Sequence, residues 1–82
     1  MNATADAELD KLVHMANRIG QFFEAMPDGA EARAGIATHL QRYWPPSMRH
    51  ALWMGAAEGR APALMPLVQQ ALQQLPGPAA RS

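Results

Sequence analysis

The sequence contains no cysteine among its 82 residues. Disulfide bonds, iron–sulfur clusters and zinc sites with cysteine ligands are therefore excluded. A chain this short buries only about 63% of the surface that its unfolded form exposes, and such small domains usually need a further source of stability. Without disulfides, we expect that stability to come from close helix packing or from another protein. The absence of cysteine also fits a cytoplasmic protein.

An excess of charge of one sign is also missing. Seven Lys and Arg residues balance seven Asp and Glu residues, which gives a formal net charge of +0. Domains that bind nucleic acids carry a basic surplus that displaces counterions, so we expect no nucleic-acid partner. Charged residues make up 17% of the chain and hydrophobic residues 49%. This composition is too apolar for a disordered chain and leaves apolar surface available to a partner.

Long apolar runs are absent as well. No run approaches the roughly 20 apolar residues that a helix needs to span a bilayer. The first residues have neither the basic region nor the apolar region of a secretory signal. We therefore expect a cytoplasmic protein with no membrane contact.

Alternation of apolar and polar residues, the pattern of a strand, is missing, while prolines and glycines divide the chain into helical segments. Asp28 is the expected N-cap of the second helix and Gly59 the C-terminal glycine of the third. We predict an all-α fold, a small bundle of about four short helices, in a single domain over residues 1–75. Residues 76–82 are predicted to be a disordered C-terminal tail. The expected helices span residues 6–25, 29–43, 46–58 and 62–75.

Apolar residues recur at three- and four-residue steps and predict which face of each helix is buried. In the first helix, Phe22 and Met26 are assigned to this face, and Gly20 is expected to let another helix approach closely. In the second helix, the last inward position is Tyr43 or Trp44. The inward face of the third helix is predicted to consist of Met48, Ala51, Leu52 and Gly55.

Residues that support catalysis or bind metals form no recognisable pattern. His14, His39 and His50 lie on three different helices, and none has a second ligand at the spacing of a metal-binding motif. There is no phosphate-binding loop, nucleophile elbow or close pair of inward carboxylates. We therefore expect no metal, no cofactor and no enzymatic activity of the chain alone.

Aromatic and cationic side chains are concentrated around the turn at residues 45–46. Tyr, Trp and Arg are enriched at binding hot spots, so this region is the candidate contact surface for a partner. A competing interpretation places Trp44 in the core, where it closes a helix corner, and leaves Trp53 exposed. The candidate partner-binding residues are His39, Arg42, Trp44, Arg49 and Trp53.

Five segments of the chain follow one another in the order and at the spacing of one known family. Residues 12–20 (LVHMANRIG) are similar to the family pattern LVxMANQI, and residues 22–23 are a Phe-Phe pair. Residues 39–44 (HLQRYW) fit H-x-x-[KR]-[FY]-W, and residues 48–49 fit the end of D-P-x-M-R. Residues 64–72 (LMPLVQQAL) are similar to L-x-P-L-V-x-x-A-L. Together, these segments resemble the delta subunit of NAD-dependent formate dehydrogenase.

Three positions depart from the family pattern. Arg18 stands where the family usually has Gln, Pro45 stands where it has Asp, and Ser47 stands where Arg is common. The missing Asp removes a side chain that would cap the third helix.

The resemblance implies a place in a complex that oxidises formate to carbon dioxide and passes the electrons to NAD. In that family the large catalytic subunit holds a molybdenum or tungsten bis-pterin centre and iron–sulfur clusters. The NAD-reducing subunits transfer the electrons from there to NAD. The implied role of this chain is a non-catalytic accessory (delta) subunit without cofactors that binds and stabilises the large catalytic subunit. The alternative is a transient assembly chaperone or helical adaptor for the same enzyme. A helix-turn-helix DNA-binding protein is disfavoured by the neutral charge.

Overall fold

The computed structural model describes residues 3–75 of the chain. Its four helices are α1 (Ala3–Glu24), α2 (Gly29–Tyr43), α3 (Pro46–Ala57) and α4 (Pro66–Leu72). Residues 3–75 contain no strand, which confirms the all-α prediction. The tail predicted at residues 76–82 lies outside the described residues.

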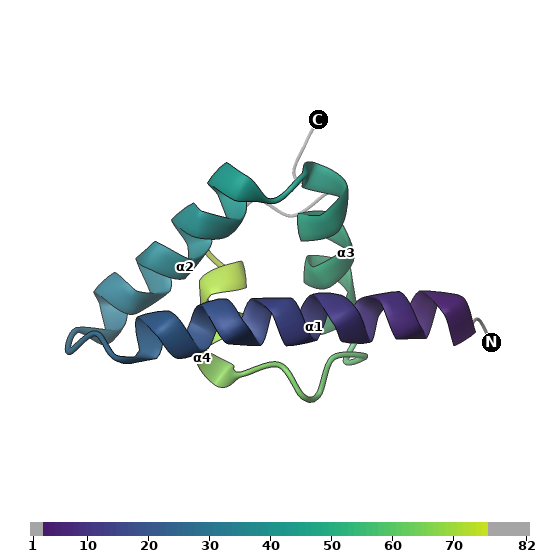
Figure 1. Cartoon of the computed structure of the whole chain (residues 1–82), viewed down its shortest axis with the longest axis horizontal. Coiled ribbons are helices and arrows are strands. Elements are labelled where there is room, and N and C mark those ends of the chain that lie inside the picture. Colours follow the sequence, from purple (N-terminus) through teal and green to yellow (C-terminus); the bar gives the residue numbers. More distant parts are fainter. Residues whose placement is uncertain (1–2, 76–82) are drawn as a thin grey trace.

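Helix α1 is the base on which the other helices are arranged. In Figure 1, α2 and α3 approach α1 at different points along its length and come together at their other ends, so that the three helices outline a triangle. Helix α4 lies behind α1 in this view and packs against both α1 and α2. The molecule is flat, with extents of 41 × 30 × 21 Å.

Local signals set the boundaries of α2 and the end of α3 near the predicted positions. Asp28 Oδ1 accepts hydrogen bonds from the backbone N–H groups of Ala30 (2.8 Å) and Glu31 (3.4 Å), so Asp28 is the N-cap of α2. Trp44 precedes a proline, adopts an extended conformation (φ −93°, ψ 136°) and ends α2. Gly59 follows α3 with φ +75°, the left-handed conformation of a C-terminal glycine.

The predicted helix 62–75 is too long, because α4 spans only Pro66–Leu72. The Asn17 side chain on α1 binds the segment before α4: Nδ2 donates to the carbonyl O of Ala63 (3.0 Å), and Oδ1 accepts from the N–H of Met65 (2.9 Å). A helix that began at residue 62 would need both backbone groups for its own hydrogen bonds. The proline after Met65 also disfavours helical dihedrals there, and ψ of Met65 is 140°.

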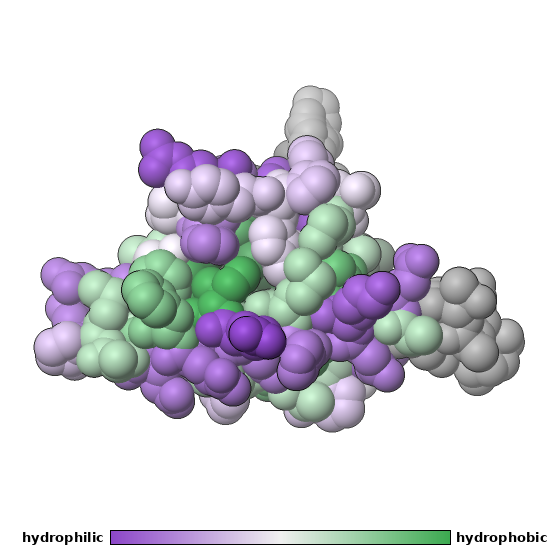
Figure 2. Space-filling view, viewed as in Figure 1, coloured by the Kyte–Doolittle hydropathy of each residue, from purple (hydrophilic) through white to green (hydrophobic). Residues whose placement is uncertain are grey.

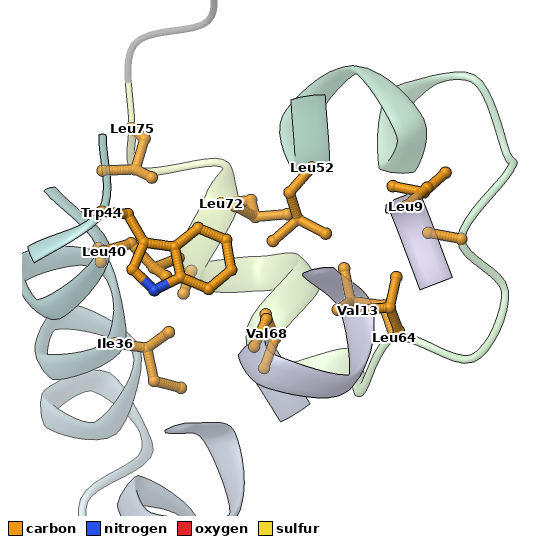
Figure 3. Close-up of a cluster of buried hydrophobic side chains, with 14 residues drawn as sticks. Leu9, Val13, Ile36, Leu40, Trp44, Leu52, Leu64, Val68, Leu72 and Leu75 are labelled. Atoms are coloured by element: carbon orange, nitrogen blue, oxygen red, sulfur yellow. The ribbon is translucent and has the colours of Figure 1, made fainter. Parts of the chain in front are cut away.

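The core lies where α1, α2 and α4 converge, and α3 closes one side of it. Figure 3 shows Trp44 and Leu40 at the end of α2 beside Leu72 of α4, with Leu52 of α3 next to them. No polar or charged side chain is buried in the described part of the chain. The buried apolar residues of the core cluster are Leu9, Val13, Ala16, Ile36, Ala37, Leu40, Trp44, Leu52, Ala61, Leu64, Val68, Ala71, Leu72 and Leu75.

Gly20 of α1 lies where α4 packs closely against it. A methyl group added at Gly20 would lie 2.6 Å from Val68 Cγ2 and 3.1 Å from Met65 Sδ. Both distances are shorter than ordinary van der Waals contacts. The prediction that another helix packs over Gly20 is therefore confirmed.

Two residues assigned to the buried face of α1 are exposed instead. Phe22 is 75% exposed and Met26 is 36% exposed. Phe23 is half-buried against α2, whereas Phe22 is about 100° away round the helix and Met26 lies beyond the end of α1 at Glu24. The apolar stripe of α1 thus extends beyond the surface that the other helices cover.

The predicted inward face of α3 is correct for Leu52 and Gly55, which are buried, and wrong at one edge. Ala51, which was assigned inward, is exposed, and Trp53, which was assigned outward, is half-buried against the core. Trp53 shares a groove with Leu72 of α4 and packs against the core, so the core continues on this side of α3, whereas Ala51 lines an open hollow with Met15 of α1. Gly55 packs against α1 as predicted, where an added methyl group would lie 2.8 Å from Leu9 Cδ1.

Candidate functional site

The five predicted contact residues lie in different parts of the molecule. His39 and Arg42 are on α2, Arg49 is at the corner between α2 and α3, and Trp53 lines a groove between α3 and α4. Trp44 is only 7% exposed, which agrees with the interpretation that its indole closes the corner from inside the core. The role of the other four residues in binding a partner stays a prediction.

Arg49 joins the two helices of the corner. Its Nη1 donates to the carbonyl O atoms of Trp44 (2.8 Å) and Gln41 (3.2 Å) at the end of α2. The last carbonyls of a helix have no partner within the helix and carry partial negative charge, so a guanidinium there is favourable. Pro45, the N-cap of α3, provides no side-chain hydrogen bond, as the departure from the family pattern predicts. Arg49 thus already has a structural role within the chain.

Trp53 lies apart from the other candidates. Its side chain lines a groove with Ala56 of α3, Gln69 and Leu72 of α4, and Leu75. No charged residue lines this groove among the residues that the structure describes. The groove therefore provides apolar contact and glutamine amides, but no group that would select a charged partner.

His39 belongs to a row of aromatic side chains where α1 and α2 meet. The rings of Phe22 and Phe23 are edge-to-face at 5.2 Å between centroids, Phe23 and His39 are 6.4 Å apart, and His39 and Tyr43 are 4.9 Å apart. We call these four residues the aromatic ridge. Figure 2 shows apolar side chains gathered above α1 and beside the lower part of α2, with polar side chains around them.

The two ends of the aromatic ridge are open to solvent. Phe22 is 75% exposed and Tyr43 is 66% exposed. A large apolar ring held in water is unfavourable, and exposed apolar patches with polar rims are typical of interaction sites. The ridge therefore has the character of a contact surface.

Two shallow hollows flank the middle of the ridge and share Phe23 and His39. One is completed by Phe22 and Ile19 together with Arg18, and the other includes Tyr43, Gly35 and Thr38 together with Arg42. Each hollow thus contains one arginine. Among the described residues, no Asp or Glu lines either hollow, so the formal charges that line the two hollows are those of the two arginines.

Gly35 of α2 holds the centre of the ridge in position. A methyl group added there would lie 2.5 Å from Phe23 Cε1 and 2.7 Å from Cδ1. Because only a glycine leaves room for the ring, Phe23 packs directly on the backbone of α2. His39, one turn further along α2, then meets the edge of the same ring.

Residue patterns alone missed Phe22, Tyr43 and Arg18 as members of this surface. Two signals were available. The Phe-Phe pair and Tyr43 belong to the motifs that resemble the delta subunit family, and Phe22 lies off the centre of the apolar stripe. What the pattern does not contain is the crossing of α1 and α2 that brings residues 18–23 beside residues 39–43.

The structure offers no arrangement for a metal ion within its described part. There, no group of three His, Cys, Asp or Glu side chains is close enough to hold one. In the same part of the chain, no helix has the length and apolar character required to cross a membrane.

Comparison with known proteins identifies the family. Residues 11–72 match the family model described as NADH-dependant formate dehydrogenase delta subunit FdsD. No curated protein and no solved structure gives a significant match. The matched region covers most of the 82 residues and includes the whole aromatic ridge. On this basis the chain belongs to the family of delta subunits of NADH-dependent formate dehydrogenase.

Proposed function

We propose that this chain is a non-catalytic accessory subunit of a cytoplasmic molybdenum or tungsten formate dehydrogenase that reduces NAD. In this role it binds and stabilises the large catalytic subunit, next to the NAD-reducing subunits. The observation that carries the proposal is the exposed aromatic ridge, in which Phe22 and Tyr43 project into solvent on a chain with a small core. The family match supports formate dehydrogenase as the enzyme.

The chemistry of the surface favours binding over catalysis. The ridge and its two hollows contain aromatic rings, two arginines, a histidine and the hydroxyl of Thr38, with no cysteine, no serine and no pair of carboxylates. Its hollows are shallow, whereas sites for small substrates are concave and largely enclose their ligand. A broad apolar surface with a cationic border instead fits another protein.

The test compares complete and incomplete enzyme. The enzyme subunits are produced with and without this chain, and formate-dependent NADH formation is measured together with the yield and metal content of the large subunit. We expect a lower yield of active enzyme without the chain and recovery when it is restored. If yield, metal content and activity are the same in both preparations, the chain has no accessory function.

Stoichiometry separates two forms of this role. A permanent subunit remains in the purified active enzyme at a constant ratio to the large subunit. A transient assembly chaperone or adaptor is required during production but is absent from the mature complex. Quantitative mass spectrometry of the purified enzyme measures this ratio directly.

A further inference from the structure

The aromatic ridge combines an apolar surface with positive charge on each side, and this combination restricts what it accepts. We infer that the ridge binds a segment of the large catalytic subunit that presents apolar side chains flanked by carboxylates. This inference rests on the proposed function and adds the chemistry of the contact. Its apolar residues would cover Phe22 and Ile19, and its carboxylates would pair with Arg18 and Arg42.

The apolar part of the argument comes from the hollow beside α1. Ile19, Phe22 and Phe23 line it, and Phe22 leaves three quarters of its surface in water. Burial of apolar surface is the main favourable term in most protein associations. The central ring is already fixed on Gly35, so little conformational freedom is lost when the partner binds.

The electrostatic part comes from Arg18 and Arg42. Both are exposed, and the one ion pair among the described residues, Arg60–Glu58, involves neither of them. A guanidinium binds a carboxylate through two parallel hydrogen bonds, which gives direction as well as affinity. A second copy of this chain is a poor occupant, because a symmetric contact through the ridge would bring cationic hollows together.

Charge reversal tests the electrostatic part. The double variant Arg18→Glu/Arg42→Glu and the control Lys11→Glu are compared with the wild type for binding to the purified large subunit. Lys11 is exposed on the same helix as Arg18 but lines a different hollow, next to α3. We expect at least a tenfold weaker affinity for the double variant and less than a threefold change for Lys11→Glu. Equal loss in both, or no loss in either, would overturn the inference.

Photo-crosslinking tests the identity of the occupant. A benzophenone amino acid replaces Phe22, which is exposed, and the control position is Gln74, which is exposed and lies outside the hollows described for the ridge. From position 22, we expect a crosslink to a peptide of the large subunit rich in Asp or Glu and apolar residues. A crosslink to a basic or uncharged peptide, to a second copy of this chain, or to the same peptide from position 74 contradicts the inference.

The two proposals fail in distinguishable ways. If the wild-type chain does not bind the large subunit at all, the proposed function fails. If the wild type binds and the charge-reversed variant binds equally well, the accessory function stands and the assignment of the ridge is wrong. Circular dichroism of each variant confirms that its helices are intact, since both arginines are exposed and have no partner that the fold requires.

Discussion

At the scale of single residues, two adjacent aromatic side chains at the end of α2 have opposite environments. Tyr43 is 66% exposed and ends the aromatic ridge, whereas Trp44 is 7% exposed and packs in the core. The sequence predicts that one of the two faces inward, and the structure selects Trp44. This assignment can be tested by truncating each ring separately.

We predict that Trp44→Ala lowers the free energy of unfolding by about 3–5 kcal/mol, the usual cost of removing a large buried side chain. Because small domains have a total stability of roughly 5–15 kcal/mol, this loss should move the urea midpoint to a much lower concentration. Tyr43→Ala is the matched control, with an expected change within about 0.5 kcal/mol. Urea titration followed by circular dichroism measures both, and equal loss of stability in the two variants would contradict the assignment.

Gly20 provides a second test at this scale. In an exposed helix, Gly→Ala usually stabilises by about 1 kcal/mol. Here the added methyl group would lie 2.6 Å from Val68 Cγ2, and Val68 is fully buried, so we expect Gly20→Ala to destabilise by roughly 1–3 kcal/mol. At Gly29 the nearest atom is Arg33 Nη1 at 3.4 Å, so Gly29→Ala should be neutral or stabilising by up to about 1 kcal/mol. Thermal unfolding of both variants shows whether the change in stability has opposite signs, and stabilisation by Gly20→Ala would contradict the prediction.

At the scale of elements, Asn17 determines where α4 begins. Its amide bonds to the backbone of Ala63 and Met65, across 46 and 48 residues of the chain. We predict that Asn17→Ala destabilises the domain by about 1–3 kcal/mol, because it leaves a partly buried N–H and a carbonyl without partners. Gln21→Ala, which removes an exposed amide from the same helix, is the control and should change little. Chemical denaturation measures the stability of both variants. If both lose the same amount, the hydrogen bonds of Asn17 do not stabilise the start of α4.

Arg49 has the corresponding role at the corner between α2 and α3. We predict that Arg49→Ala costs about 1.5 kcal/mol of stability, because the carbonyl O atoms of Trp44 and Gln41 lose a charged donor. Arg42→Ala removes an exposed arginine of the ridge and should leave stability unchanged while weakening partner binding. Denaturation curves and binding assays on both variants separate the two roles. If Arg49→Ala leaves the stability unchanged, Arg49 has no structural role at the corner, and only its predicted role in binding remains.

At the scale of the whole molecule, the neutral net charge conceals an uneven distribution. The chain carries a formal charge of +0, yet the described residues of the two hollows on the ridge include only cationic charges. Attraction to an acidic surface would therefore be local and would not extend to nucleic acids or to anionic surfaces in general. The small core adds a further consequence, because a partner that binds only the folded state also stabilises it.

We predict that the large subunit slows global exchange of the core amides of this chain. At a concentration of about 100 times the dissociation constant, the stabilisation amounts to roughly 2.7 kcal/mol, or about 100-fold slower exchange through global unfolding. Amides of α2 and α4 around Leu40 and Val68, both fully buried, are the ones to follow by hydrogen exchange and mass spectrometry. Phe22→Ala at the same concentrations should show less protection. Exchange that is independent of the partner would argue against a stabilising role.

The fold class and most helix ends could be predicted from residues that lie within a few positions of one another in the sequence. Asp28 binds the first N–H groups of α2, the proline after Trp44 ends that helix, and Gly59 takes the left-handed conformation after α3. These effects depend on local backbone geometry and hydrogen bonding, so the sequence alone determined an all-α chain with helices near their observed positions. It also determined that Gly20 lies under another helix.

Contacts between distant residues decided the rest. Asn17 prevents the last helix from starting at residue 62, and the position of Leu72 beside α3 leaves Trp53 half-buried against the core. The residues of the candidate site also fall into two groups, those predicted from the sequence and those found only in the structure. His39 and Arg42 were predicted from residue type, but Phe22 and Arg18 joined them only because α1 and α2 cross beside Gly35. Helical periodicity reports which residues share a face of one helix, whereas the extent to which that face is covered depends on how the helices pack.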